Sequence, residues 1–302
     1  MRLVRFNRHV EAPSLARLGV ALRGALVADL RAGYAAYLTA RGDGQAIDIA
    51  SVRIPPTIAA LIAAEALATR ELRDVVHWLE DASAADPQRA GLRGEPLFTP
   101  LQACRLHAPV RSTNLFIALT GESRSPSFTM KPSIAVVGPA RDIRLPKEVS
   151  EVTCAPGLAV VIGRACRDVD ESEAADVIAG YFVMTNVSKP SSAPERSFDD
   201  GMYETFAPSG PWLVSRDEIP DPTNLSVEMR VNGTVRRRFS TAAMRWTTPQ
   251  LIASLSCATL QAGDVIWVDA PDASRDDVRV RVDDHVETIV EGVGMIRNRV
   301  VR

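Results

Sequence analysis

Gly157-Leu-Ala-Val-Val-Ile-Gly-Arg164 is an apolar run of strand length that a glycine closes, and Gly180-Tyr-Phe-Val-Met-Thr-Asn-Val-Ser188 is a second run of the same kind. β-Branched and aromatic residues favour strands, so both runs are predicted to be β-strands. Between them, the acidic residues 168–179 include alanine, valine and isoleucine at spacings that suit a short amphipathic helix. Residues 157–188 therefore predict a strand, a helix and a second strand, around which the rest of the chain is organised.

Patterns on either side of this stretch predict more strands than helices. Residues 278–300 alternate apolar and polar positions, which is typical of half-buried strands. Asn232-Gly233 predicts a tight turn, and Arg236-Arg-Arg238 after it is interpreted as a solvated hairpin arm rather than a phosphate site. Near the N-terminus we expect a strand at residues 2–6, one or two strands within 14–30, and an alanine-rich helix at 56–79. The fold class is thus predicted to be α+β and rich in β-structure.

Composition excludes several classes of function. The chain has 302 residues, of which 46% are hydrophobic, enough for one substantial domain and a smaller one. Its net charge of -2 gives no basic field for nucleic acid or an anionic membrane. The four cysteines are widely spaced, which indicates free thiols in a reducing compartment, and no apolar run approaches the ~20 residues of a membrane span. We expect a soluble, cytoplasmic protein.

Several separate motifs, in their order and spacing, resemble the fumarylacetoacetate hydrolase family. They are Ala159-Val-Val-Ile-Gly-Arg164, the Gly180–Ser188 run, Phe206-Ala-Pro-Ser-Gly-Pro-Trp-Leu-Val214, Val231-Asn-Gly233, Leu260-Gln-Ala-Gly-Asp-Val-Ile266 and Glu291-Gly-Val-Gly-Met-Ile-Arg-Asn-Arg-Val300. The resemblance implies a rolled mixed β-sheet domain, usually dimeric, behind a small α/β N-terminal domain. We accordingly expect a small domain at residues 1–81, a linker at 82–104 and the main domain at 105–302, assembled as a homodimer.

The chemistry that the resemblance would imply is missing from this sequence. Members of the family bind a divalent metal through a Glu-x-Glu pair and an Asp, and the alignment puts Ala155, Gly157 and Asn186 at these positions. The family's lid carries a His and a Glu that activate water. Here residues 120–126 form a shorter segment without the His. Divalent Mg or Mn needs hard oxygen ligands, so we expect neither a metal nor another cofactor.

Six residues remain as candidates for the site. Lys131 keeps the Phe-x-x-Lys-Pro context in which the family's lysine points into the active site, although a surface lysine beside a turn-forming proline is the alternative. Desolvation would lower the pKa of Lys131 and suit it as a base, whereas a charged Lys131 would hold a carboxylate or enolate. The catalytic candidates are Lys131, Glu204 and Asp269, the last of which stands in the loop that binds substrate anions in the family. The candidates for substrate binding are Thr185, Asn186 and Lys189.

Three functions are left open. The first is an enzyme that acts without metal on an enolisable keto, dicarbonyl or polyketide-like small molecule, by isomerisation, cyclisation, dehydration or C–C cleavage. The second is a non-catalytic binding or assembly subunit. The third, a metal-dependent acylpyruvate-type hydrolase or decarboxylase, requires a different alignment at Ala155-Pro-Gly157. An open pocket at Lys131 and Asn186 would favour an enzyme, and a cavity filled by Met202, Leu119 and Trp267 would favour the non-catalytic subunit.

Overall fold

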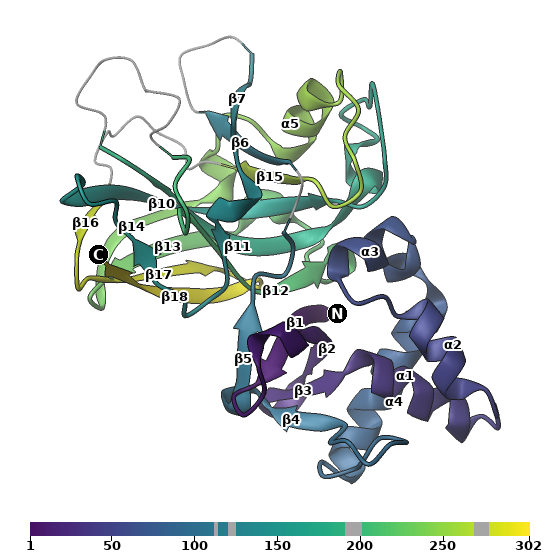
Figure 1. The fold of residues 1–302 in the computed structure, drawn as a ribbon. Coiled ribbons are helices and arrows are strands. Elements are labelled where there is room, and N and C mark those ends of the chain that lie inside the picture. Colours follow the sequence, from purple (N-terminus) through teal and green to yellow (C-terminus); the bar gives the residue numbers. More distant parts are fainter. Residues whose placement is uncertain (112–113, 120–124, 191–200, 269–277) are drawn as a thin grey trace.

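The computed structural model describes residues 1–111, 114–119, 125–190, 201–268 and 278–302 (Figure 1). Within these ranges the strands form two sheets, one of 13 strands and one of 5. Five short strands near the N-terminus belong to the larger sheet: β1 (Arg2–Arg8), β2 (Arg17–Leu22), β3 (Leu26–Asp29), β4 (Phe98–Pro100) and β5 (Cys104–His107). The first strand pairs with β2, β5 and the distant β12 (Ala207–Ser215), so the N-terminal strands continue the sheet of the main body.

Four of the five α-helices in the described ranges gather beside the N-terminal strands, where Figure 1 shows them as one group. They are α1 (Leu30–Ala40), α2 (Ala46–Arg53), α3 (Ile58–Ala63) and α4 (Arg70–Ala85), with α5 (Thr248–Leu255) in the main body. The prediction of one continuous helix over residues 56–79 is wrong, because the chain forms two separate α-helices there, α3 and α4. Glu65 adopts a left-handed conformation with a φ of 52°, which ends α3, and Thr69 then caps α4 by accepting a hydrogen bond from the Leu72 backbone.

Two long antiparallel strands, β10 (Glu151–Ile162) and β11 (Ile178–Ser188), form the centre of the larger sheet. Both were predicted, but the helix predicted between them is wrong. Residues 168–179 contain only a 3-10 helix, Ala174–Val177, whose Ala174 and Val177 are buried. Ile178 already belongs to β11, so pairing with β10 holds the end of this segment in an extended conformation. At Gly180 a Cβ atom would lie 2.1 Å from the Val214 carbonyl oxygen, so only glycine allows β12 to approach this closely.

The remaining strands of the larger sheet flank this centre. On one side β10 pairs with β15 (Val265–Val268), which leads through β6 (Leu115–Leu119) to β7 (Ser127–Lys131). At its other end β10 pairs with β16 (Val278–Arg281). The short strand β8 (Val136–Val137) lies parallel to β12. β7 is an edge strand of this sheet, and its last residue, Lys131, reaches the end of β11 with its side chain.

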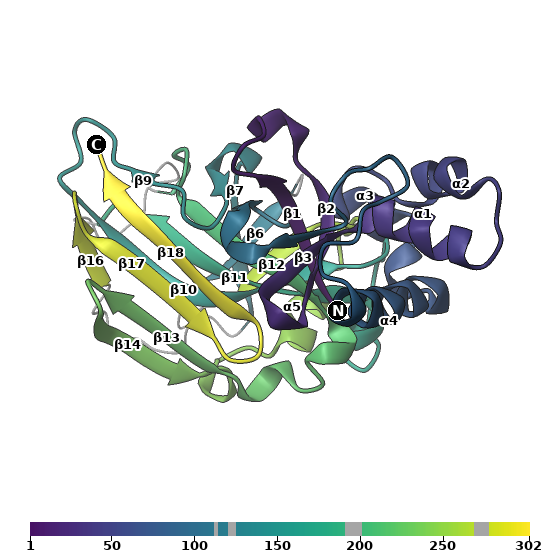
Figure 2. The same ribbon diagram turned by 90° about the horizontal axis from the view of Figure 1, so that it is seen from below.

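The smaller sheet covers one face of β10 and β11, as Figure 2 shows. Its strands are β14 (Thr234–Ser240), β13 (Ser226–Val231), β17 (His285–Val290), β18 (Gly294–Val301) and β9 (Ile143–Arg144), in that order. The predicted turn at Asn232-Gly233 joins β13 to β14, and both residues have the positive φ that a tight hairpin turn requires. The alternation predicted for residues 278–300 is confirmed, because β17 and β18 bury every second residue.

The core between the two sheets is apolar, with Val160, Val183 and Ile296 among its fully buried members. A second large cluster lies on the other face of β10 and β11 and continues among the N-terminal helices. Of the helices in the described ranges, none has the length and apolar character needed to cross a membrane. The predicted β-rich α+β fold class is confirmed.

Candidate active site

The positions where the family carries its metal ligands share one face of the β10–β11 pair. Ala155 lies directly opposite Asn186, and Gly157 lies opposite Met184. Residues opposite each other in antiparallel strands point to the same face, and so do alternate residues along one strand. Ala155, Gly157 and Asn186 therefore do lie together, on the face turned away from the smaller sheet. We call this face the inner face of β10–β11.

Trp267 of β15 covers the inner face at Gly157. The indole is fully buried, and its Nε1 donates a hydrogen bond of 3.3 Å to the carbonyl oxygen of Met184. A Cβ atom on Gly157 would lie 2.5 Å from that Nε1 and 2.6 Å from the Val268 carbonyl oxygen. Trp267 thus occupies the space that a side chain at position 157 would need, and a glutamate there is incompatible with this indole.

The residues present do not fit a divalent metal. Ala155 and Gly157 have no side-chain oxygen, and Asn186 offers one neutral amide oxygen, so these three positions supply no carboxylate to offset dehydration of the ion. The Oδ1 atom of Asn186 is buried without a hydrogen-bond partner. Throughout the described part of the chain, no three His, Cys, Asp or Glu side chains come together as a metal site.

Lys131, the last residue of β7, is a buried ionisable group where the end of β11 meets the segment before β12. Its side chain is only 5% exposed, and its Nζ donates hydrogen bonds to the carbonyl oxygens of Val187 and Phe206, the second at 2.8 Å. Burial lowers the pKa of Lys131 from 10.5 to about 7, against a smaller opposing effect of Cys154. A substantial fraction of Lys131 is therefore a neutral amine near neutral pH.

The local backbone is built around this lysine. The Phe206 carbonyl accepts from both the Val187 amide, at 3.0 Å, and Lys131, so the end of β11 and the turn at residues 203–206 meet at the ammonium group. A Cβ atom on Gly201 would lie 3.0 Å from the Cε atom of Lys131. The alternative that Lys131 is an ordinary surface lysine is wrong, because its side chain is buried.

The other predicted site residues are not all brought to Lys131. Thr185 is buried on the opposite face, where its hydroxyl lies 2.7 Å from that of Thr288 on β17, and so it joins the two sheets. Glu204 is exposed in the turn before β12. Lys189 lies with its Nζ 4.6 Å from the ring centre of Tyr203. Asp269 lies outside the described residues. Asn186 precedes Val187, whose carbonyl oxygen accepts a hydrogen bond from Lys131.

Of the three residues that would fill the cavity of a non-catalytic subunit, two have described side chains, and these are buried to different extents. Trp267 is completely buried, Met202 is half-buried, and the Leu119 side chain lies outside what the structure describes. The predicted short lid at residues 120–126 falls almost wholly outside the described residues.

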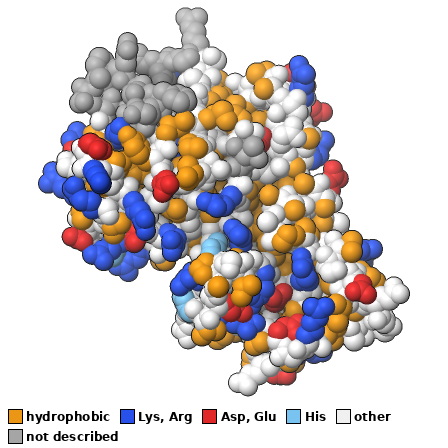
Figure 3. Space-filling model, in the orientation of Figure 1, with side chains coloured by type: hydrophobic (Ala, Val, Ile, Leu, Met, Phe, Trp, Pro, Cys, Tyr) orange, Lys and Arg blue, Asp and Glu red, His pale blue; other side chains and the backbone are white. Residues whose placement is uncertain are grey.

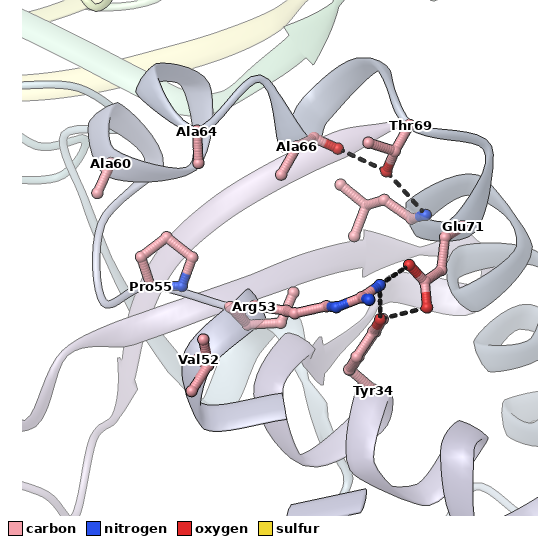
Figure 4. A pocket seen from close by; sticks show the side chains of 11 residues that line it. Tyr34, Val52, Arg53, Pro55, Ala60, Ala64, Ala66, Thr69 and Glu71 are labelled. Atoms are coloured by element: carbon pink, nitrogen blue, oxygen red, sulfur yellow. Dashed lines mark hydrogen bonds and ion pairs between the residues drawn. The ribbon is translucent and has the colours of Figure 1, made fainter. Parts of the chain in front are cut away.

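A pocket lies elsewhere, among the N-terminal helices (Figure 4). It has a volume of about 300 Å³ and is walled by Pro55, several alanines and Leu72. Its polar groups satisfy one another, because Glu71 accepts from both the Tyr34 hydroxyl and the Arg53 guanidinium. Burial, and then the Glu71 carboxylate, raise the pKa of Tyr34 to about 12. This closed set of partners is typical of a structural network.

Sequence reasoning missed the carbonyl groups that hold Lys131, because backbone acceptors leave no mark on residue identity. Val187 and Phe206 are separated from Lys131 by 56 and 75 positions. The only available sign was the Phe128-x-x-Lys131-Pro132 context. The cavity at Tyr34 and Arg53 was missed for a related reason, since its lining comes from five separate helical segments.

Comparisons with known proteins agree with this architecture. Residues 107–301 match the family described as fumarylacetoacetate (FAA) hydrolase C-terminal. A presumed hydrolase of Burkholderia multivorans is 42% identical over 152 residues, which are 49% of this chain and 54% of that protein. The chain thus matches about half the length of such curated relatives.

Two solved structures are also similar. The 2-hydroxyhepta-2,4-diene-1,7-dioate isomerase of Mycobacterium marinum has a TM-score of 0.61 at 32% identity, over 68% of this chain and 81% of that one. Maleylpyruvate hydrolase of Sphingobium sp. SYK-6 has a TM-score of 0.73 at 25% identity, over 100% of this chain and 99% of that one, and it has also been solved with manganese(II) and pyruvate. The predicted relationship is confirmed: this chain is a member of the fumarylacetoacetate hydrolase family, whose relatives include hydrolases and isomerases, and it has the fold of that family.

Proposed function

We propose that this chain is an enzyme that acts without metal on an enolisable keto or dicarbonyl compound, with Lys131 as its acid–base group. The observation that carries the proposal is the burial of Lys131 against two carbonyl groups, which lowers its pKa to about 7. A general acid–base catalyst works best when its pKa lies near the operating pH. The relatives named above support the substrate class, because their names refer to enolic or keto dicarboxylates.

In the proposed step, the neutral amine of Lys131 removes a proton from the carbon next to a carbonyl group. The C–H electron pair becomes the enolate, and Lys131 becomes an ammonium ion. Return of the proton from the Lys131 ammonium ion to another carbon of the enolate gives isomerisation. The buried Oδ1 of Asn186 is available to accept a hydrogen bond from an enol hydroxyl. Lys189 stays in the proposal as a candidate for substrate binding, and Glu204 and Asp269 stay as candidates for proton transfer, in a cytoplasmic homodimer.

Exchange of α-protons tests the step without knowledge of the final product. Maleylpyruvate and acetylacetone, incubated with the protein in D₂O containing a chelator, would be followed by NMR. We expect deuterium incorporation whose rate rises with pH through about 7 and is flat above it, as a base of that pKa requires. Lys131→Met, checked by circular dichroism for folding, should lower the rate by about 10²-fold or more.

Two outcomes would reject this proposal. If exchange occurs only after manganese is added, the metal-dependent alternative is correct. If a folded Lys131→Met variant exchanges protons as fast as the wild type, Lys131 has a structural role only. The pH profile of the wild type decides the matter even where the variant does not fold.

A second candidate is a non-catalytic binding or assembly subunit, which the buried indole at Gly157 favours. A site filled by protein leaves less room for substrate. This candidate predicts no exchange with either probe at any pH, and no effect of manganese.

A further inference from the structure

Strands β1 and β5 bring a histidine and two arginines to one face of the larger sheet. Arg5 lies directly opposite His107, and Asn7 lies opposite Arg105. These residues alternate along their strands, so all of them point to the same face. The Nε2 atom of His107 lies 2.6 Å from the Oδ1 atom of Asn7. Because the Asn7 amide nitrogen already donates to two backbone carbonyls, His107 is the donor in this hydrogen bond.

A turn at residues 138–141 adds a further arginine from the main body. A Cβ atom on Gly138 would lie 2.9 Å from the Cα atom of His107, so the turn lies directly against β5. The carbonyl oxygen of Arg141 accepts a hydrogen bond of 2.7 Å from Asn298, which anchors the turn to β18. Arg111 follows β5 a few residues further on. We call Arg5, Arg105, Arg111, Arg141 and His107 the junction cluster.

No negative charge balances the junction cluster among the described residues. The four guanidinium groups form neither ion pairs nor side-chain hydrogen bonds there, and Asp142, the nearest acid in sequence, is exposed and makes no ion pair. The Nε atom of Arg5 is buried without a partner. Figure 3 shows Lys and Arg side chains with a histidine where the helical part joins the main body. By contrast, Arg17 on the neighbouring strand pairs with both Glu11 and Asp29.

Like charges held together this way interact unfavourably. Burial, and then Arg5, Arg105, Arg141 and Arg111, lower the pKa of His107 to about 4, so the imidazole is neutral at physiological pH. Burial and Arg111 likewise lower the pKa of Arg5. Arginine stays protonated in proteins, so the cluster cannot relieve its own repulsion by losing a proton. An external anion can relieve it.

We propose that the junction cluster binds a compact oxyanion with more than one negative charge, of the phosphate or dicarboxylate class. The planar guanidinium group presents pairs of N–H donors that match the oxygen atoms of either class. Arg5 has a buried N–H without an acceptor, and Arg111 and Arg141 have exposed donors from two other segments. The site lies on different strands from Lys131 and is independent of the function proposed above.

Isothermal titration of the whole chain with inorganic phosphate, and separately with succinate, tests this proposal at constant ionic strength in chloride buffer. We expect one anion per chain to bind. Arg141→Glu and Arg111→Glu should each weaken binding by about tenfold or more, because each reverses a charge at the site. The matched control is Arg236→Glu on β14, an exposed arginine that also forms no ion pair, and it should change the affinity by less than about twofold.

The two anions separate the classes. Binding of phosphate alone assigns a phosphate ester, binding of succinate alone assigns a dicarboxylate, and either result supports the site. The proposal is overturned if neither anion binds, or if Arg236→Glu weakens binding as much as the two cluster variants do, since binding would then depend only on net charge. Because Arg111 and Arg141 are exposed, both variants should fold, which circular dichroism would check.

Discussion

The two faces of the β10–β11 pair differ in how they are filled. The face toward the smaller sheet carries Leu158, Val160 and Val183, which pack against β-branched residues of β13 and β17. The inner face carries Ala155, Gly157 and Asn186, and an indole from β15 covers the glycine. The first face has the side chains that any buried strand pair needs. The second has small side chains and an amide whose Oδ1 atom is buried without a partner.

This difference separates what holds the fold from what performs chemistry. The family fold is present although the three positions that hold metal in the resemblance carry no carboxylate, so the carboxylates were not needed to form the sheet. Loss of side chains from the inner face leaves space, and Trp267 fills it with a large apolar group. A scaffold can therefore keep its packing while one of its faces changes function.

The largest effect is expected from restoring a family carboxylate. Gly157→Glu would place a Cβ atom 2.5 Å from the Trp267 indole and bury an unpaired charge, so it should lower the free energy of unfolding by about 4 kcal/mol or more. If Trp267 is the obstacle, Trp267→Gly should recover part of that loss in the double variant, with a coupling of about 1–3 kcal/mol. Urea unfolding of the four proteins in the cycle measures the coupling.

Strict additivity of the two substitutions would contradict this account of the two faces of the β10–β11 pair. It would mean that the indole and a side chain at position 157 do not compete, and that the inner face is closed for another reason. The single variant Trp267→Gly also destabilises the protein, so the coupling and not the individual loss is the informative quantity.

Local signals in the sequence predicted the strands and the turns. The turn Asn232-Gly233 and the alternation before Val300 depend on neighbouring residues only, and both are found. The helix predicted over residues 168–179 failed because β11 begins at Ile178, which is set by pairing with β10. Ordinary residues differ in helix propensity by no more than about 0.7 kcal/mol per residue. Tertiary pairing with β10 outweighs such a small preference.

The candidate site was predictable only in part. The absence of the three carboxylates could be seen from the motif alignment at Ala155 and Gly157. The burial of Lys131 and its acceptors at Val187 and Phe206 depend on segments more than fifty positions away. The junction cluster similarly joins Arg5, His107 and Arg141, whose proximity follows from the sheet register and from the turn at Gly138.

An intermediate effect is expected in the pH dependence of stability at Lys131. The folded state lowers its pKa from 10.5 to about 7, so the ammonium form is disfavoured in the folded protein. Between those two values the unfolded chain binds the proton and the folded chain does not, so stability rises with pH. The unfolding free energy of the wild type, minus that of Lys131→Met, should increase by up to about 1.4 kcal/mol per pH unit in this range.

Urea unfolding of both proteins at pH 7, 8 and 9 measures this difference, and other titrating groups cancel in it. Below pH 7 the difference should be constant, because the lysine is then protonated in both states. A difference that does not change between pH 7 and 9 would show that the two carbonyl groups compensate the buried ammonium ion, and the acid–base role of Lys131 would lose its support.

The smallest effect is expected at Asn186. Its Oδ1 atom is buried without a partner, so the amide already carries the cost of desolvation in the folded state. Asn186→Leu removes that cost and should change the free energy of unfolding by less than about 1 kcal/mol in either direction. Asn186→Asp, the matched control of nearly equal shape, buries a charge in the same place and should destabilise more than Asn186→Leu does. The reverse order would mean that a cation, such as the Lys131 ammonium ion, lies close enough to pair with a carboxylate at this position, and the inner face would then still favour a negative charge there.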